Sequence, residues 1–156
     1  MSTSVSTPTV PATAAPTPAN RAVAGTLGGL LGGAVFGLMM QAWGMLPMVA
    51  MLVGSESVAV GWLVHLAISA VLGLGFGLIS VRGLDAWLPG IGMGLAYGAV
   101  WWVLGALLLM PLSLGMPTFV LGTMAWQSLL GHLVFGLILG AVSVAVLRGS
   151  QRPSSV

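Results

Sequence analysis

Residues 57–81 read SVAVGWLVHLAISAVLGLGFGLISV and decide the fold, because they contain no Asp, Glu, Lys or Arg. A helix needs about 20 mainly apolar residues to cross the hydrocarbon core of a bilayer, so this stretch predicts one transmembrane helix. Two flanking runs, residues 22–55 and 86–147, also lack these charged residues. The first is long enough for one helix and a shorter apolar segment. The last is long enough for two helices and a connection.

The composition of the whole chain fits a membrane protein. Hydrophobic residues make up 58% of it and charged residues 4%, and the mean hydropathy is +1.11. Soluble domains carry about 25% charged residues, so this chain cannot cover a water-facing surface. We therefore expect an all-α polytopic membrane protein whose partners are the lipid bilayer and other membrane proteins or further copies of itself. Four arginines without a basic patch indicate no nucleic acid, and the lack of cysteine excludes disulfides and thiolate metal sites.

Proline and polar residues divide the last run at MPLSLGMPT, residues 110–118. The four predicted spans are about 22–45, 58–80, 88–110 and 124–147. The apolar segment PMVAMLVGS that follows Leu46 is too short to span and is predicted to be interfacial or re-entrant. Residues 1–20 are rich in Ser, Thr, Pro and Ala, so we expect a disordered tail there. The transmembrane domain should cover 21–148, and 149–156 should form a short second tail.

The arginines predict the orientation of the chain in the membrane. Arg21 precedes the first span, Arg82 lies between the second and third, and Arg148 and Arg152 follow the fourth. With four spans, all four arginines fall on one side, and the outer connections hold Glu56 but no Lys or Arg. The positive-inside rule then places both termini in the cytoplasm and the protein in the inner membrane of a cell.

An internal similarity predicts that the spans form a tandem repeat of two helical hairpins. The similar segments are WLVHLAISAVLGLG (62–75) with QSLLGHLVFGLILGAV (127–142), and GGAVFG (32–37) with YGAVWW (97–102). The first pair aligns His65 with His132 and Gly73 with Gly140. Because the repeated unit contains two spans, both copies begin on the same side of the membrane. The two copies should therefore be parallel and related by an axis along the membrane normal.

Small residues recur at four-residue spacing in every predicted span. Helices in lipid associate by close packing, which small residues permit, so these faces should meet other helices. The glycines expected to pack in this way are Gly29, Gly33, Gly37, Gly73, Gly77, Gly90, Gly94, Gly98, Gly136 and Gly140.

Two histidines, His65 and His132, lie on the small-residue faces, in line with Ser69 and Ser128 respectively. An ionisable residue inside a membrane is a functional hypothesis by default, so these four residues form the candidate polar or ligand site. The favoured hypothesis is that neutral imidazoles hydrogen-bond across helices and hold the bundle together. The alternatives are a path for protons or a small solute, and axial ligation of one haem by both imidazoles.

No other pattern predicts chemistry. Met45, Met48 and Met51 resemble a soft copper ligand set only loosely, and we favour the interpretation that they seat an apolar segment at the interface. Asp85 and Glu56 lie on opposite sides and cannot form a carboxylate pair. No GxSxG, P-loop or HExxH motif is present. We therefore expect no metal, no cofactor and no enzymatic activity, but a structural or accessory component of the membrane.

Three segments resemble those of a family of uncharacterised small four-span integral membrane proteins from bacteria and archaea. The segments are LPMVAMLVGS (46–55), WLVHLAISAVLGLGFGL (62–78) and LLGHLVFGLILG (129–140). The resemblance covers about residues 25–147 and implies the four-span fold, but no catalytic residue. Family members often have a polar residue after the Pro–Met pair, where this chain has Val49.

Overall fold

The computed structural model describes residues 15–80, 83–84 and 86–150, and these residues form helices joined by short connections, with no strand among them. The elements are α1 (Pro18–Ala42), α2 (Leu46–Met51), α3 (Val58–Ile79), α4 (Trp87–Trp101), the π-helix η1 (Trp102–Leu109), α5 (Met110–Ser113) and α6 (Thr123–Ser150). Four stretches are long and apolar enough to span a membrane, namely α1, α3, the continuous helix Trp87–Ser113 and α6. The predicted all-α, four-span fold is thereby confirmed.

The first and last helices are longer than predicted. Thr17 caps α1, because its hydroxyl oxygen accepts a hydrogen bond of 3.2 Å from the Asn20 N–H, and Pro18 takes the favoured first helical position. Residues 18–20 therefore belong to the helix and not to the predicted tail 1–20, of which 1–14 lie outside the described residues. At the other end, α6 extends through Ser150, so residues 149–150 of the second predicted tail belong to the helix, and residues 151–156 lie outside the described residues.

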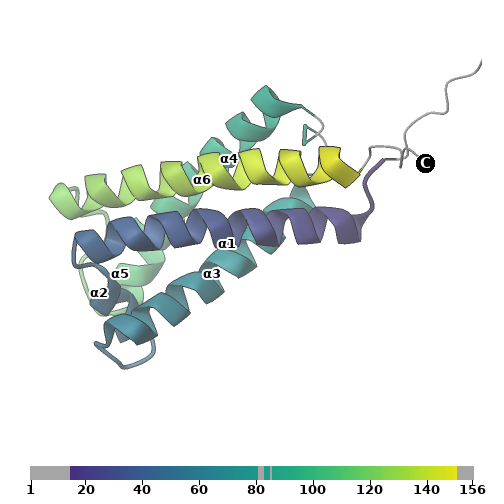
Figure 1. The fold of residues 1–156 in the computed structure, drawn as a ribbon. Helices are drawn as coiled ribbons and strands as arrows, with labels where there is room; N and C mark the ends of the chain where they lie inside the picture. Colours follow the sequence, from purple (N-terminus) through teal and green to yellow (C-terminus); the bar gives the residue numbers. More distant parts are fainter. Residues whose placement is uncertain (1–14, 81–82, 85, 151–156) are drawn as a thin grey trace, which may run out of the picture.

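The segment predicted to be interfacial or re-entrant forms the short helix α2. Gly44 has a φ of 71°, a left-handed conformation that turns the chain back after α1. Pro47 then lies in the first turn of α2. Figure 1 shows α2 beside the first turns of α3, and a Cβ at Gly61 of α3 would meet the main chain of Leu46. The bare glycine surface thus lets α2 pack directly on α3.

Within each hairpin the two long helices meet through small residues. A Cβ added at these glycines of α1 or α4 would meet the main chain of the facing helix or, at Gly33, the side chain of Ser69, so only small residues lie between the two helices. The close approaches are Gly29 with Gly73 and Gly33 with Ser69 in α1 and α3, and Gly94 with Gly140 and Gly98 with Gly136 in α4 and α6.

The hairpins also contact each other along the antiparallel pair α1 and α6, which lie side by side in Figure 1. A Cβ at Gly28 would lie 2.8 Å from the carbonyl oxygen of Leu139, and one at Gly32 would lie 2.8 Å from that of Phe135. A Cβ at Gly131 of α6 would meet the ring of Phe36. We call this contact the closed seam, because three glycines in register bring the helices together.

Helices α3 and α4, the other long pair between the hairpins, hardly approach each other as backbones. Their contact is made by the side chain of Tyr97, whose hydroxyl donates a hydrogen bond of 2.8 Å to the carbonyl oxygen of Leu72. The Tyr97 ring also packs against Phe76, with ring centroids 5.3 Å apart. We call this side of the bundle the open seam, because a tyrosine stands between the two helices.

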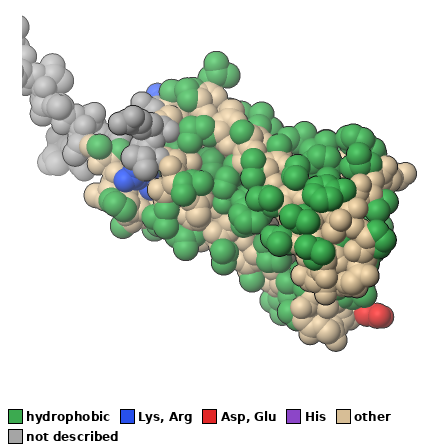
Figure 2. Space-filling model, turned by 180° about the vertical axis from the view of Figure 1, so that it is seen from behind, with side chains coloured by type: hydrophobic (Ala, Val, Ile, Leu, Met, Phe, Trp, Pro, Cys, Tyr) green, Lys and Arg blue, Asp and Glu red, His purple; other side chains and the backbone are tan. Residues whose placement is uncertain are grey.

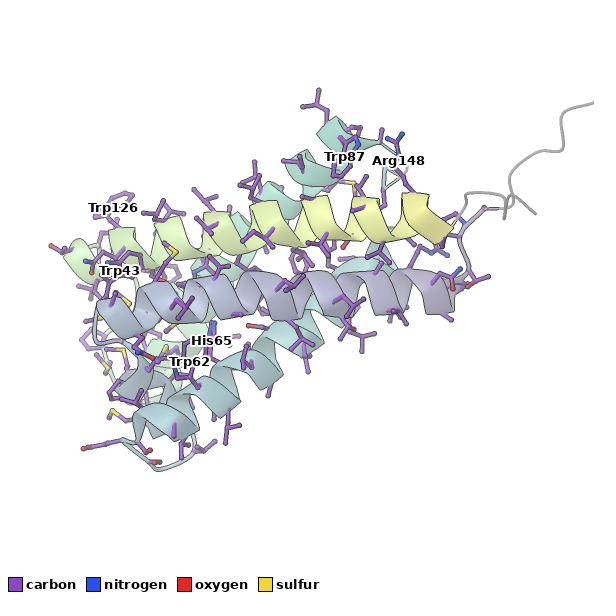
Figure 3. The ribbon with its side chains drawn as sticks, viewed as in Figure 1. Trp43, Trp62, His65, Trp87, Trp126 and Arg148 are labelled. Carbon is purple, nitrogen blue, oxygen red and sulfur yellow. The ribbon has the colours of Figure 1, made fainter. Side chains whose placement is uncertain are left out.

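The outer surface is that of a membrane-embedded protein. Large apolar side chains are exposed along it, among them Leu88 and Leu63, which are 84% and 70% exposed. Figure 2 shows hydrophobic side chains over the length of the molecule, with the described basic side chains at one end and the acidic one at the other. Trp43, Trp62 and Trp126 lie at one end and Trp87 lies near Arg148 at the other (Figure 3), as expected for aromatic residues at two interfaces.

Candidate functional site: a histidine cavity between the hairpins

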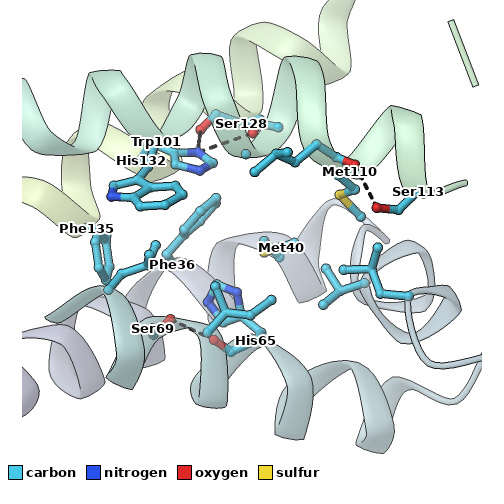
Figure 4. Close-up of a pocket in the computed structure, with 17 residues that line it drawn as sticks. Phe36, Met40, His65, Ser69, Trp101, Met110, Ser113, Ser128, His132 and Phe135 are labelled. Atoms are coloured by element: carbon cyan, nitrogen blue, oxygen red, sulfur yellow. Dashed lines mark hydrogen bonds between the residues drawn. The ribbon is translucent and has the colours of Figure 1, made fainter. Parts of the chain in front are cut away.

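A cavity of about 250 Å³ lies between the two hairpins. Its walls come from α1, α2 and α3 on one side and from the end of α4, η1, α5 and α6 on the other (Figure 4). All four residues of the predicted polar site line it, namely His65, Ser69, Ser128 and His132. The structure thus brings together side chains from two helices that are far apart in the sequence. We call this space the histidine cavity.

His65 ties α3 to α1. Its side chain is buried, and Nε2 lies 2.9 Å from the carbonyl oxygen of Gly33. Because a carbonyl oxygen can only accept, Nε2 carries the proton and donates this bond. One turn further along α3, the Ser69 hydroxyl donates a hydrogen bond of 2.8 Å back to the His65 carbonyl oxygen. His65 therefore makes the cross-helix hydrogen bond that the favoured hypothesis describes.

His132 makes its bond within its own helix. Its Nδ1 lies 2.8 Å from the carbonyl oxygen of Ser128 and 3.3 Å from the Ser128 hydroxyl. Because the Ser128 carbonyl oxygen can only accept, Nδ1 of His132 donates this hydrogen bond. The proton of the neutral ring is therefore on Nδ1, and Nε2 carries a lone pair. Among the described residues, none donates a hydrogen bond to Nε2 of His132. This nitrogen is also not one of the polar atoms that are fully buried without a partner, so a ligand can reach it. The half-buried His132 therefore offers the cavity an unused hydrogen-bond acceptor.

Phe36 separates the two histidines. Its ring centroid lies 5.3 Å from that of His65 and 4.9 Å from that of His132, and Figure 4 shows its ring between the two imidazoles. One haem iron would need a lone pair from each ring directed at the same point. Here Nε2 of His65 is engaged by Gly33, and an aromatic ring occupies the space between the imidazoles. This geometry does not favour ligation of one iron by both histidines.

The wall opposite His65 is formed by the π-helix η1. Trp101, Gly105 and Ala106 line the cavity from the end of α4 and from η1. The indole N–H of Trp102 donates a bond of 3.0 Å to the carbonyl oxygen of Ala125, which fastens the first turn of η1 to α6. π-Helical turns are rare and often occur at functional sites, where they change the direction of the side chains that follow.

The cavity opens toward the surface that faces lipid. Ile68 of α3 and Leu109 of η1 both line it, yet they are 41% and 52% exposed on the outside of the bundle. They lie on the two helices that flank the open seam, so a molecule dissolved in the bilayer could enter between them. No carboxylate lines the cavity among the described residues, and Glu56 lies in the connection between α2 and α3.

The sequence predicted the polar residues of this site but not its aromatic ones. Phe36 and Trp101 line the cavity with the histidines. The segments GGAVFG and YGAVWW place these two rings at matching positions of the repeat, a signal that could have found them. Compared with protein-family models, with curated proteins and with solved structures, the chain matches none.

Proposed function

We propose that this protein is a non-enzymatic membrane protein that binds a small amphiphile in the histidine cavity. The ligand class is a compact apolar molecule with one hydroxyl or N–H donor, taken up from the bilayer. The observation that carries the proposal is the lone pair on Nε2 of His132, which has no donor among the described residues and faces an otherwise largely apolar space.

The size and lining of the cavity support this ligand class. Small-molecule sites are mostly apolar and contain a few polar groups that orient the ligand. At about 250 Å³ the cavity would accept a group the size of a substituted benzene ring, flanked by Phe36 and Trp101. A charged ligand is disfavoured, because the described lining offers no side chain of opposite charge.

The proposal is tested with two matched ligands, 4-propylphenol and 4-propylanisole. They differ in that the phenol has a donor and the methyl ether has none. Thermal unfolding of the full chain in detergent would give the affinity of each ligand for the wild type and for His132→Phe, which keeps a ring but removes the acceptor. The quantity compared is the affinity for the phenol divided by the affinity for the methyl ether. We expect this ratio to be about fivefold larger for the wild type than for His132→Phe, equivalent to one hydrogen bond of ~1 kcal/mol.

Comparing the affinity ratio of the wild type with that of His132→Phe cancels any difference in how the two ligands partition into the micelle. An equal preference in the wild type and in His132→Phe would overturn the proposal. Should the variant fail to fold, ¹⁵N NMR of the histidine-labelled wild type reports directly whether Nε2 of His132 accepts a bond from the phenol. An absorption spectrum of the same purified protein tests the haem alternative.

We further propose that both termini are cytoplasmic. The described basic residues Arg21 and Arg148 lie at the same end of the bundle, whereas Glu56 lies in a connection at the other end. This distribution supports the positive-inside orientation in an inner membrane. Reporter fusions should therefore place the C-terminus in the cytoplasm and a site after Glu56 outside. A fusion after Ser150 that reports the outer side would contradict this orientation.

The tandem repeat of two hairpins is also a proposal. It is supported by the contacts inside the hairpins, because Gly29 with Gly73 in the first corresponds to Gly94 with Gly140 in the second under the sequence alignment. The seams between the hairpins do not follow this correspondence. The repeat proposal therefore describes how each hairpin is built and not how the two assemble.

A further inference from the structure

A second cavity, of about 400 Å³, lies at the outer end of the bundle, next to the histidine cavity. We call it the methionine cavity, because six of the ten methionines of the chain line it. They are Met40, Met45, Met48, Met110, Met116 and Met124. Figure 3 shows most sulfur atoms gathered at this end of the molecule. Of the triplet considered from the sequence, Met45 and Met48 line the cavity, but Met51 does not and is 44% exposed.

These methionines converge from separate parts of the fold. Met40 belongs to α1, Met48 to α2, Met110 to α5 and Met124 to α6, while Met116 lies in the connection before α6. Methionine is a common filler of irregular gaps, because its side chain is unbranched and flexible. Methionines that only filled a gap would leave little space between their side chains. These methionines instead surround a cavity that is larger than the histidine cavity.

The loop that covers the cavity is held in a strained conformation. Pro111 has no N–H and cannot donate to the carbonyl oxygen of Leu107 one helical turn before it. Instead, the N–H of Phe119 donates to that oxygen, at 3.0 Å. Phe119 adopts a φ of 57°, which is costly for an aromatic residue. Strained residues gather at ligand sites, and this one lines the methionine cavity itself.

We propose that the methionine cavity binds a soft monovalent metal ion, Cu(I) or its analogue Ag(I). Thioether sulfur is a neutral, polarisable ligand that selects soft ions of this kind, whereas hard cations require oxygen ligands. Among the described residues of the lining, the only other side chain with a ligating atom is that of Ser128. Met116 and Met124 are 45% and 48% exposed, so the site is reachable from the outer end of the bundle.

The test is a calorimetric titration of the full chain in detergent with AgNO₃ in chloride-free buffer. Ag(I) needs no reductant and has the same preference for sulfur. We expect saturable binding of about one ion per chain to the wild type. In Met116→Leu/Met124→Leu the affinity should fall by at least about tenfold, because ligands are lost while side-chain volume is kept. Both positions are partly exposed and neither lines the histidine cavity, so the variant keeps that site intact.

Met93→Leu is the matched control, because Met93 lies in α4 outside the methionine cavity. It should leave the Ag(I) affinity unchanged, and excess Na⁺ or Zn²⁺ should not displace the silver. Absence of binding to the wild type would overturn the proposal. So would an equal affinity in the double variant, or an equal loss in Met93→Leu, since both would show unspecific binding to thioethers. A second readout is silver-dependent protection of the methionines from oxidation, located by mass spectrometry.

Discussion

Helices α1 and α6 approach so closely that Gly28 and Gly32 lie against main-chain carbonyls of α6, whereas α3 and α4 are kept apart by the side chain of Tyr97. Both pairs consist of apolar helices of similar composition. Helices in lipid gain little from hydrophobic attraction to each other, so the distance between them depends on the size of the residues at the contact. The two seams illustrate this dependence within one small bundle.

The sequence alignment of the hairpins makes the comparison sharper. Tyr97 occupies the position of α4 that corresponds to Gly32 of α1, and Met93 the position that corresponds to Gly28. Leu72, which accepts the hydrogen bond from Tyr97, corresponds to Leu139, whose carbonyl lies against Gly28. Large residues at the positions of small ones therefore open one side of the bundle. The histidine cavity lies between the hairpins, bordered by α3 on this open side.

The closed seam should be the most sensitive part of the molecule. Gly28→Ala and Gly32→Ala each place a methyl group against a carbonyl oxygen of α6. We expect each to lower the free energy of unfolding by about 1–3 kcal/mol, because the two backbones must move apart. The measurement is reversible unfolding in mixed micelles titrated with sodium dodecyl sulfate.

Gly92→Ala is the control for this experiment. Gly92 lies in α4, and a Cβ there would meet nothing within 4 Å. The substitution should leave stability unchanged or raise it by up to about 1 kcal/mol, since alanine favours the helix. If Gly92→Ala cost as much as the two changes in α1, the loss would reflect the glycines themselves and not the closed seam.

Tyr97→Gly should partly convert the open seam into a closed one. The chain has no cysteine, so a thiol-reactive spin label attaches only to cysteines that are introduced. Suitable positions are Val71→Cys of α3 and Val100→Cys of α4, where the valines are 66% and 51% exposed. Distances from electron paramagnetic resonance should shorten by about 2 Å in the glycine variant, the range of interaxial distances that side-chain size produces. Binding of the phenol in the histidine cavity should weaken in parallel.

Tyr97→Phe serves as the comparison for this variant, because it keeps the ring and removes only the hydrogen bond to Leu72. It should cost about 1 kcal/mol of stability and leave the distance between the labels unchanged. An unchanged distance in Tyr97→Gly would mean that the tyrosine does not hold the helices apart and that the cavity has another cause.

Much of this arrangement could be predicted from the sequence. The uncharged runs predict the four spans, and the four-residue spacing of small residues on α3 coincides with its buried face, which meets α2 at Gly61 and α1 at Gly73 and Gly77. The alignment of His65 with His132 predicted two side chains that do line one cavity. Each of these features depends on the periodicity of a single helix or on a comparison of two segments.

The contacts between hairpins could not be predicted in this way. Periodicity shows which face of a helix packs, but not which neighbour covers it. The pairing of α1 with α6 therefore remained open, and so did the role of Tyr97. The methionine cavity depends on residues from Met40 to Met124, which come together only in the folded chain. The two imidazoles also differ, because His65 donates from Nε2 to Gly33 and His132 donates from Nδ1 to Ser128. The spacing of residues in the sequence does not predict either of these hydrogen bonds.

The smallest expected effect separates the two histidines, which the sequence treats as equivalent. His65→Leu removes a hydrogen bond between helices and should cost about 1 kcal/mol, in the range measured for such bonds in membrane proteins. His132→Leu removes only a bond to the preceding turn of its own helix and should change stability by less than about 0.5 kcal/mol. Because both rings pack against Phe36, the two changes share a contact partner, and the double variant should depart from the sum of the single losses by at least about 0.5 kcal/mol. Unfolding titrations of the three variants measure all three quantities, and equal losses from the single changes would show that both histidines hold the bundle alike.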